Sequence, residues 1–348
     1  MKATKRVVEK LRRSIARDAK FAVAEWLEQG LPPDAELVFE PTRVPRTMLN
    51  YACEKNALNV MKLLIGAGAK ADEGKYSKPL FTAVLFGRRN VVKMLLDAGS
   101  NPNASIPYLE DNDRGFTPLM KAASCPGSLA MVEYLIKRGA DPHRLTQKGN
   151  SALSFAVAHG NRPVIARLTK LGCRMSGPQL RIPVYSGDVD TVKLLIRAGA
   201  DVNETKRGKY GFAGLASLDI AIQERGSRLE NREIFAGYGR GGAEIIARSA
   251  AEGRRYLQII KDLIAAGADV NRVTVDDSPL YRATKNGDLE VVKLLLRAGA
   301  DPKKAVCFLP WTTKLKDTAV EVANTSGFTR IAKLLTLAGK SQRTKKVP

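Results

Sequence analysis

The sequence predicts an all-α fold, a solenoid built from stacked helix-turn-helix units. Two observations carry this prediction. A phrase of the type Leu-Leu-Ile-x-Ala-Gly-Ala recurs along the chain, at 63–69, 194–203, 262–271 and 294–302. A second phrase, Thr-Pro-Leu or Ser-Pro-Leu followed by Ala, precedes it in most units, as at 117–123 and 278–283. Repeated phrases indicate repeated structural units instead of one central core.

The glycine that ends each first phrase gives the length of the units. These glycines are Gly68, Gly99, Gly139, Gly172, Gly199, Gly267, Gly299 and Gly339. The intervals between them are 31, 40, 33, 27, 68, 32 and 40 residues, so three lie close to 33. The two intervals of 40 contain extra residues at 104–113 and 303–316. The array therefore has about eight units, and we expect Gly30 to close an atypical unit before them.

Each part of a unit has a physical reason. The hydroxyl of Thr117 or Ser278 can accept a hydrogen bond from a free backbone N–H at a helix start. The proline that follows has a fixed φ that suits the first helical position. Leucines and valines of 286–296 then fall at helical spacing. The closing glycine suits the left-handed turn that follows a helix. Each unit is thus a short helix, a tight turn and a second helix.

This pattern resembles the ankyrin repeat family. The matching residues are the Thr-Pro-Leu-x-x-Ala phrase, the Val-Val-x-x-Leu-Leu segment and the Gly-Ala-Asp-(Val/Pro)-Asn close. The resemblance covers 46–339, which leaves N-terminal capping helices in 1–45 and a basic tail at 340–348. It implies antiparallel helix pairs whose closing loops project as β-hairpin fingers. It also implies that partners bind the fingers and the concave face beside them.

One interval departs from the pattern. The 68 residues between Gly199 and Gly267 hold a single convincing unit with an insertion at about 226–253. The insertion is rich in arginine and contains Gly-Tyr-Gly-Arg-Gly-Gly at 237–242. It lacks the strand and the Gly-Lys-Ser/Thr ending of a phosphate-binding loop. We expect short helical pieces around a glycine hinge, either as a tolerated surface excursion or as a part specific to this protein's function.

Two more segments can be placed from local signals. Apolar residues in 3–19 have amphipathic helical spacing, which predicts a capping helix with a polar face toward water. The unit that follows Gly172 is short and has Pro178 and Pro183 near its first helix. We expect that helix to be brief or distorted.

The charge balance points to an anionic partner. Lys and Arg total 57 against 35 Asp and Glu, a formal net charge of +22. Many of these cations fall in the expected fingers, which line up in space. Acidic residues in 104–114 interrupt the stripe. The candidate partner-binding residues are Lys75, Tyr76, Lys78, Arg144, Lys148, Lys206, Arg207, Lys209, Tyr210, Arg240, Lys303, Lys304 and Trp311. Such a stripe raises the local concentration of an anionic partner.

We therefore expect a non-enzymatic scaffold, adaptor or inhibitor, a monomer that holds an acidic protein segment through its fingers and concave face. An alternative is nucleic-acid binding through the same stripe, with the arginine-rich insertion clamping the backbone. Another is an adaptor at an anionic membrane surface that uses the basic N-terminal helix. Salt dependence and vesicle binding would separate the three.

Catalysis, cofactors and metals are not expected. His143 and His159 lie in different units, and no nucleophile or metal motif appears. The recurring Asp201, Asp269 and Asp301 point to bracing of the finger turns. The four cysteines are widely spaced, which favours buried thiols in a reducing, cytoplasmic compartment. No apolar run is long enough to span a bilayer.

Overall fold

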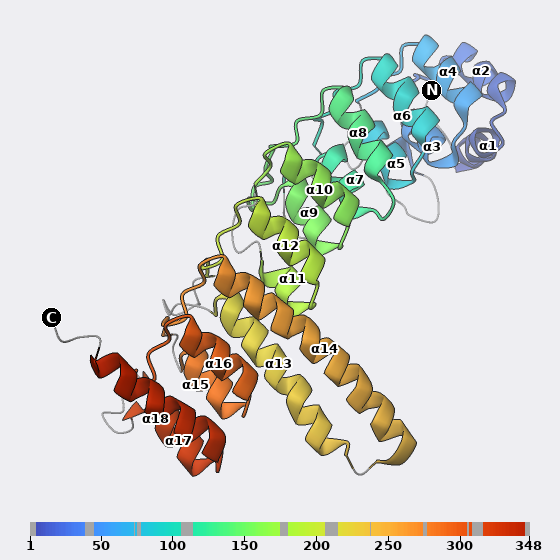
Figure 1. Cartoon of the computed structure of the whole chain (residues 1–348). Coiled ribbons are helices and arrows are strands. Elements are labelled where there is room, and N and C mark those ends of the chain that lie inside the picture. The colour runs from blue at the N-terminus through green and yellow to red at the C-terminus, as the bar shows by residue number, and fades with distance from the viewer. Residues whose placement is uncertain are drawn as a thin grey trace. The chain divides into compact units, whose positions relative to one another are not determined.

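A computed structural model describes residues 5–38, 45–72, 74, 78–105, 114–174, 180–205, 215–236, 238–273, 277–304, 306–307 and 316–344. The chain divides into two compact units, Met1–Ser176 and Gly177–Pro348, which we call unit 1 and unit 2. Both consist of helices arranged in consecutive pairs joined by short turns (Figure 1). The predicted all-α solenoid is confirmed.

Unit 1 holds five helix pairs in its described residues. Their bounds are α1 Lys5–Ala16, α2 Lys20–Glu28, α3 Met48–Lys55, α4 Leu58–Gly66, α5 Pro79–Leu85, α6 Arg89–Asp97, α7 Pro118–Ser124, α8 Leu129–Lys137, α9 Ala152–Ala158 and α10 Arg162–Lys170. The first helices of successive pairs contact one another in the order α1, α3, α5, α7 and α9. Strands β1 Glu36–Val38 and β2 Pro45–Thr47 pair antiparallel, with Glu36 opposite Thr47.

Unit 2 holds four helix pairs in its described residues. Their bounds are α11 Arg181–Tyr185, α12 Val189–Arg197, α13 Ser217–Ile234, α14 Gly239–Ala265, α15 Pro279–Lys285, α16 Leu289–Arg297, α17 Ala319–Thr325 and α18 Thr329–Thr344. First helices stack in the order α11, α13, α15 and α17, and second helices in the order α12, α14, α16 and α18. Strands β3 Val306–Cys307 and β4 Lys316–Asp317 pair antiparallel between α16 and α17.

The predicted caps are present at the starts of the first helices. The side chains of Thr47, Thr117, Ser151, Ser278 and Thr318 each accept a hydrogen bond from the backbone N–H three residues later. Proline occupies the first helical position of α5, α7 and α15. A serine or threonine hydroxyl thus satisfies one of the N–H groups that an α-helix leaves free at its start.

The closing glycines also behave as predicted, except for the last. Gly68, Gly99 and Gly299, for example, have φ values of +91°, +86° and +90° after their helices. Gly339 instead lies inside α18, which continues to Thr344. The sequence after Gly339 reads Lys-Ser-Gln and has no Asp-x-Asn to stabilise a turn, so the helix continues.

The first helix of the short unit is brief, as predicted, although Pro178 lies outside the described residues. Helix α11 has five residues and contains Pro183. Proline removes an N–H donor and restricts the residue before it, which shortens a helix.

The expectation for the insertion is wrong in its form. Instead of short pieces around a hinge, α13 and α14 are continuous helices of 18 and 27 residues, and together they form a long helical hairpin (Figure 1). Gly239, Gly241 and Gly242 lie in the first turn of α14. A Cβ atom on Gly242 would come within 2.4 Å of the Phe235 carbonyl oxygen, so glycine allows the first turn of α14 to approach the turn that follows α13.

The core of each unit is a layer of aliphatic side chains between the helices. In α16, Val291, Val292 and Leu295 have no exposed surface, and the equivalent residues of α6 are buried in the same way. These residues follow the i, i+1, i+4 pattern of one helix face. Because each helix buries such a face against its neighbours, the stack leaves its loops and its outer helix faces for contact with other molecules.

Candidate interaction surfaces

The fingers, which are the segments between the second helix of one pair and the first helix of the next, are joined by a ladder of asparagine side chains. Asn271 donates from Nδ2 to the Gly299 carbonyl at 2.9 Å and accepts at Oδ1 from the Asp301 N–H at 2.7 Å. Asn203 makes the same pair of bonds with Gly267 and Asp269, at 3.0 and 2.7 Å. In unit 1, Asn103 does so with Gly139 and Asp141. Each of these three asparagines therefore fixes the base of its finger to the base of the next finger.

The recurring aspartates brace the turns, as their repetition predicts. Asp201, Asp269 and Asp301 each accept at Oδ1 a hydrogen bond from the backbone N–H two residues later, at 2.8 to 2.9 Å. Asp141 makes the same bond to the N–H of His143 at 2.8 Å. A carboxylate in this position stabilises a tight turn, so these acids are structural.

Three predicted partner-binding cations also bond to backbone carbonyls of fingers, Arg144 and Lys304 to a neighbouring finger and Lys78 to its own. Arg144 donates from Nη1 to the Asn103 carbonyl at 2.7 Å, and Lys78 donates from Nζ to the Asp72 carbonyl at 3.1 Å. The Nζ of Lys304 donates to the Asn271 carbonyl. The positions of these side chains are set by the fold.

Arg272, which is not among the residues predicted from the sequence, repeats this arrangement. Its Nη1 donates to the Asn203 carbonyl at 2.6 Å, and its Nη2 donates to the Thr205 hydroxyl at 3.2 Å. The signal that could have found it is its place one residue after the Asp-Val-Asn close, which corresponds to Arg144 and Lys304 in other repeats.

The other predicted residues divide into two groups. Lys148, Arg240 and Lys303 are exposed. Seven lie outside the described residues: Lys75, Tyr76, Lys206, Arg207, Lys209, Tyr210 and Trp311.

The structure does not bring Arg240 to the fingers. Arg240 is in the first turn of α14, at the turn end of the hairpin, whereas Ala265 ends that helix at the finger side. A helical rise of about 1.5 Å per residue separates the two positions by about 37 Å. The insertion therefore lengthens the opposite edge of unit 2, and its arginines do not extend the finger stripe (Figure 1).

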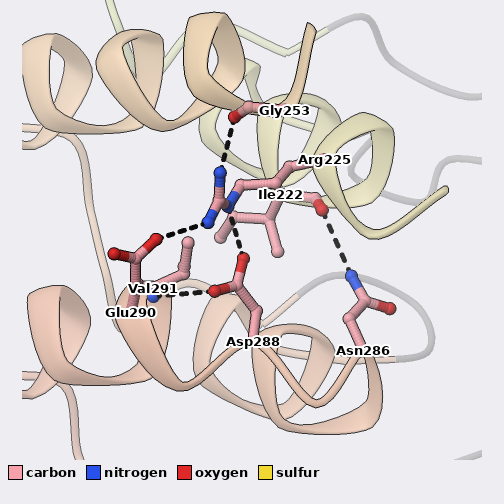
Figure 2. A network of polar contacts seen from close by, with 7 residues as sticks. All are labelled: Ile222, Arg225, Gly253, Asn286, Asp288, Glu290 and Val291. Atoms are coloured by element: carbon pink, nitrogen blue, oxygen red, sulfur yellow. Dashed lines mark hydrogen bonds and ion pairs between the residues drawn. The ribbon is translucent and has the colours of Figure 1, made fainter. Parts of the chain in front are cut away.

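The base of the hairpin is fixed by a buried arginine. Figure 2 shows Arg225 of α13 between α14 and the start of α16. Its Nε lies 2.6 Å from Asp288 Oδ2, its Nη2 lies 2.7 Å from Glu290 Oε2, and its Nη1 donates to the Gly253 carbonyl at 2.5 Å. Asp288 also accepts the Val291 N–H at 3.2 Å as the N-cap of α16. One guanidinium thus joins three helices.

A second set of contacts holds the two helices of the hairpin together. Arg228 Nε lies 2.7 Å from Glu252 Oε2, and its guanidinium lies 5.8 Å from the centre of the Tyr256 ring. The Tyr256 hydroxyl donates to the Tyr185 carbonyl at 2.9 Å. Two of the insertion's arginines are therefore used within the protein instead of being free to clamp a ligand.

The hairpin forms a cleft with the turns of the next two pairs. The cleft has a volume of about 760 Å³. Gly226, Ser227 and Glu230 line it from α13, and Asn286 and Phe328 line it from the turns. The amide of Asn286 donates to the Ile222 carbonyl at 3.2 Å, which fixes this wall of the cleft (Figure 2). The extra helix length creates a concave surface with both polar and apolar groups.

The comparisons with known proteins agree with this architecture. A family model described as "Ankyrin repeats (3 copies)" matches residues 19–106, 49–146, 103–178, 119–206 and 247–345. The chain belongs to the ankyrin repeat family.

Several curated ankyrin proteins are similar to this chain. The Caenorhabditis elegans ankyrin repeat and KH domain-containing protein mask-1 is 28% identical over 287 residues, which cover 79% of this chain and 9% of that protein. The Neurospora crassa ankyrin repeat protein nuc-2 is 32% identical over 286 residues, with 77% and 25% covered. The chicken nuclear factor NF-kappa-B p105 subunit is 26% identical over 233 residues, with 64% and 20% covered. The chain spans a quarter or less of the length of these relatives.

Among solved structures, the human ASB11 ankyrin repeat domain is similar, with a TM-score of 0.47 and 21% sequence identity. The match covers 60% of this chain and 90% of that domain.

Ankyrin repeats are modules for protein–protein interaction and are generally not enzymes. In the part of the chain that the structure describes, no group of three or more histidine, cysteine, aspartate or glutamate side chains is arranged to hold a metal ion. His159 contacts the Phe155 carbonyl of its own helix at 2.9 Å through Nδ1. None of the described helices has the length and apolar character required to cross a membrane. The ankyrin fingers, the outer helix faces and the hairpin cleft are thus the surfaces to consider.

Proposed function

We propose that this ankyrin protein is a scaffold or adaptor that holds an acidic segment of a partner protein along its fingers and the adjoining first helices. The observation that carries the proposal is the asparagine ladder, because it fixes neighbouring finger bases to each other. Cations carried on a braced framework lose less conformational freedom on binding than cations on separate loops.

The charge of the finger segments supports an acidic partner. Exposed Lys148 and Lys303 lie in described fingers, and Lys206, Arg207 and Lys209 add three cations in the sequence of one further finger. Cations on the fingers of a unit attract a carboxylate-rich segment and raise its association rate. We further propose that the chain acts as a monomer in a reducing compartment, since Cys53, Cys125 and Cys173 are free thiols.

Site-specific photo-crosslinking tests the proposal. A photoreactive amino acid at Lys148 or Lys303 should capture a protein through a segment rich in Asp and Glu, as identified by mass spectrometry of the cross-linked peptide. The same group at Lys93, on the outer face of α6, is the matched control and should not capture that protein. The triple variant K206E/R207E/K209E should weaken capture at Lys303 at least tenfold. Capture of nucleic acid, or of the same protein from Lys93, would contradict the proposal.

A further inference from the structure

A second basic surface lies away from the fingers, on the second helices of unit 2. The positions equivalent to Lys193 in α12 are occupied by lysine in all three following second helices. On each helix, a second exposed cation lies three, four or seven residues from this lysine. We call these eight residues the basic row: Lys193, Arg197, Arg254, Lys261, Lys293, Arg297, Arg330 and Lys333. All are exposed except Lys193, which is half-buried. Because α12, α14, α16 and α18 contact one another in series, the row extends over four adjacent helices.

The carboxylates in the helix segments that carry the row do not neutralise it. The segments 189–197, 254–265, 289–297 and 329–340 contain ten Lys or Arg and three Asp or Glu. Glu290 is paired with Arg225, and Asp262 accepts a hydrogen bond from Gln258 at 3.0 Å and lies 3.8 Å from Lys193. The positive charges therefore outnumber the carboxylates that could balance them.

In unit 1, charges on the same face are balanced by opposite charges on neighbouring helices. The positions equivalent to the four lysines are Lys62, Lys93, Glu133 and Ala166, so no continuous row forms. Ion pairs link adjacent second helices there: Arg138 Nη1 lies 2.8 Å from Asp97 Oδ1, and Arg167 Nε lies 3.3 Å from Glu133 Oε1. Unit 2 has one such pair, Lys193 and Asp262 at 3.8 Å, and otherwise places like charges on neighbouring second helices, where they repel each other.

The geometry of the row favours a long, rigid polyanion. Neighbouring helix axes are about 8–10 Å apart, so the three intervals from α12 to α18 span about 30 Å. Double-stranded DNA carries a phosphate about every 1.7 Å along its axis, and about nine base pairs would face the row. A duplex can therefore contact cations of all four helices at once.

The same segments lack the groups that other polyanions need. Tyr256 is the one aromatic residue in 189–197, 254–265, 289–297 and 329–340, and it is buried. Single-stranded nucleic acids gain much of their affinity from bases stacked on aromatic rings. Membrane-surface proteins commonly place Trp and Tyr at the interface. A face of cations without exposed rings suits contacts with the phosphates of a duplex, which are independent of base sequence.

We propose that the basic row of unit 2 binds the sugar-phosphate backbone of double-stranded nucleic acid. This surface is separate from the fingers, so the chain can hold a protein partner and a duplex at the same time.

Fluorescence anisotropy with a labelled 20-base-pair DNA duplex of mixed sequence tests this inference. The triple variant K261E/K293E/K333E should lose at least tenfold in affinity at 150 mM salt. If the three lysines each contact a phosphate, the slope of log affinity against log salt should fall in magnitude by about 3. The matched control is K62E/K93E/K170E, which changes the net charge by the same amount at exposed positions on the second helices of unit 1 and should lose less than twofold.

The inference would be overturned by equal losses in both triple variants, or by a wild type that does not bind the duplex at 150 mM salt. It would also be overturned if the row bound single strands, anionic vesicles or a poly-glutamate peptide more tightly than it binds the duplex. Circular dichroism establishes that the variants are folded, and K261Q/K293Q/K333Q, which removes charge without reversing it, should reproduce at least a threefold loss. Failure of the row leaves the finger proposal intact, because the photo-crosslinking experiment does not involve these lysines.

Discussion

Replacing Arg225 by methionine should destabilise unit 2 by about 3 kcal/mol, the lower end of the 3–5 kcal/mol seen when one partner of a buried ion pair is removed. The Arg225 side chain is 7% exposed and that of Asp288 is 5% exposed, so the substitution leaves a buried carboxylate without its cation. Glu290 is 68% exposed and remains solvated, and its bond to Arg225 therefore adds little to the loss.

The assay is urea unfolding followed by circular dichroism, combined with hydrogen exchange read by mass spectrometry. Repeat arrays unfold through neighbouring units, so a local loss need not spread through the whole chain. Exchange should accelerate in α13, α14 and α16, which Arg225 connects, and should remain unchanged in α3 to α8 of unit 1.

A matched arginine and a rescue variant make this prediction sharp. Arg248 also pairs with a glutamate, at 3.1 Å from Glu252, but its side chain is 82% exposed. R248A should therefore cost less than about 0.5 kcal/mol. In R225M/D288S the serine keeps the cap on the Val291 N–H and removes the buried charge, so at least half of the lost stability should return. A loss below about 1 kcal/mol in R225M, or an equal loss in R248A, would refute the reasoning.

Three further predictions follow from single residues. Burial raises the pKa of Asp219 to about 6, so its charge destabilises the fold above that pH. In urea titrations, Asp219→Asn should be more stable than wild type by on the order of 2 kcal/mol at pH 7.5, and this advantage should be lost near pH 4. Asn271→Ala removes two bonds of the finger ladder and should cost about 1–2 kcal/mol by thermal unfolding, whereas Asn90→Ala at an exposed position should cost almost nothing. Burial also raises the pKa of the Cys53 thiol. In peptide mapping, Cys53 should therefore react with N-ethylmaleimide at least tenfold more slowly than half-buried Cys125, and equal rates would contradict the burial of Cys53.

The repeated units were predictable because their signals are local. The cap at Thr117, the proline that follows it and the closing Gly139 each act within a few residues, so their roles can be read directly from the phrases. The bracing role of Asp301 could be predicted for the same reason, since its partner is only two residues away.

The insertion was harder to predict because two local signals conflict. The glycines of 237–242 suggest a hinge, while the segment from Ala243 onward is rich in residues that favour helices. Packing decides the outcome, because Gly242 allows α14 to approach Phe235 closely. Gly242 lies in the first turn of α14, where a glycine costs the helix little stability. Arg225 gives no sequence signal at all, since Asp288 is 63 residues away.

The finger cations show the limit of reading charge alone. Lys78, Arg144 and Lys304 were selected as partner-binding residues, but each also donates a hydrogen bond to a backbone carbonyl of a finger. The basic row, in contrast, could have been found by comparing the same helix position in successive repeats. Grouping the cations by loop, and not by their position in the repeat, does not reveal the basic row.

The anchored hairpin has a mechanical consequence. From the Gly253 carbonyl that Arg225 holds to the start of α14 at Gly239, the helix extends about 21 Å at 1.5 Å per residue. Such a lever converts a rotation of about 5° at its base into a displacement of about 2 Å at its tip over this length. Because Asp288 ties the base to the following repeat, a twist between these two repeats is amplified at the tip. A spin label or fluorophore at the tip would therefore report a twist between these two repeats of unit 2 as a displacement of the tip.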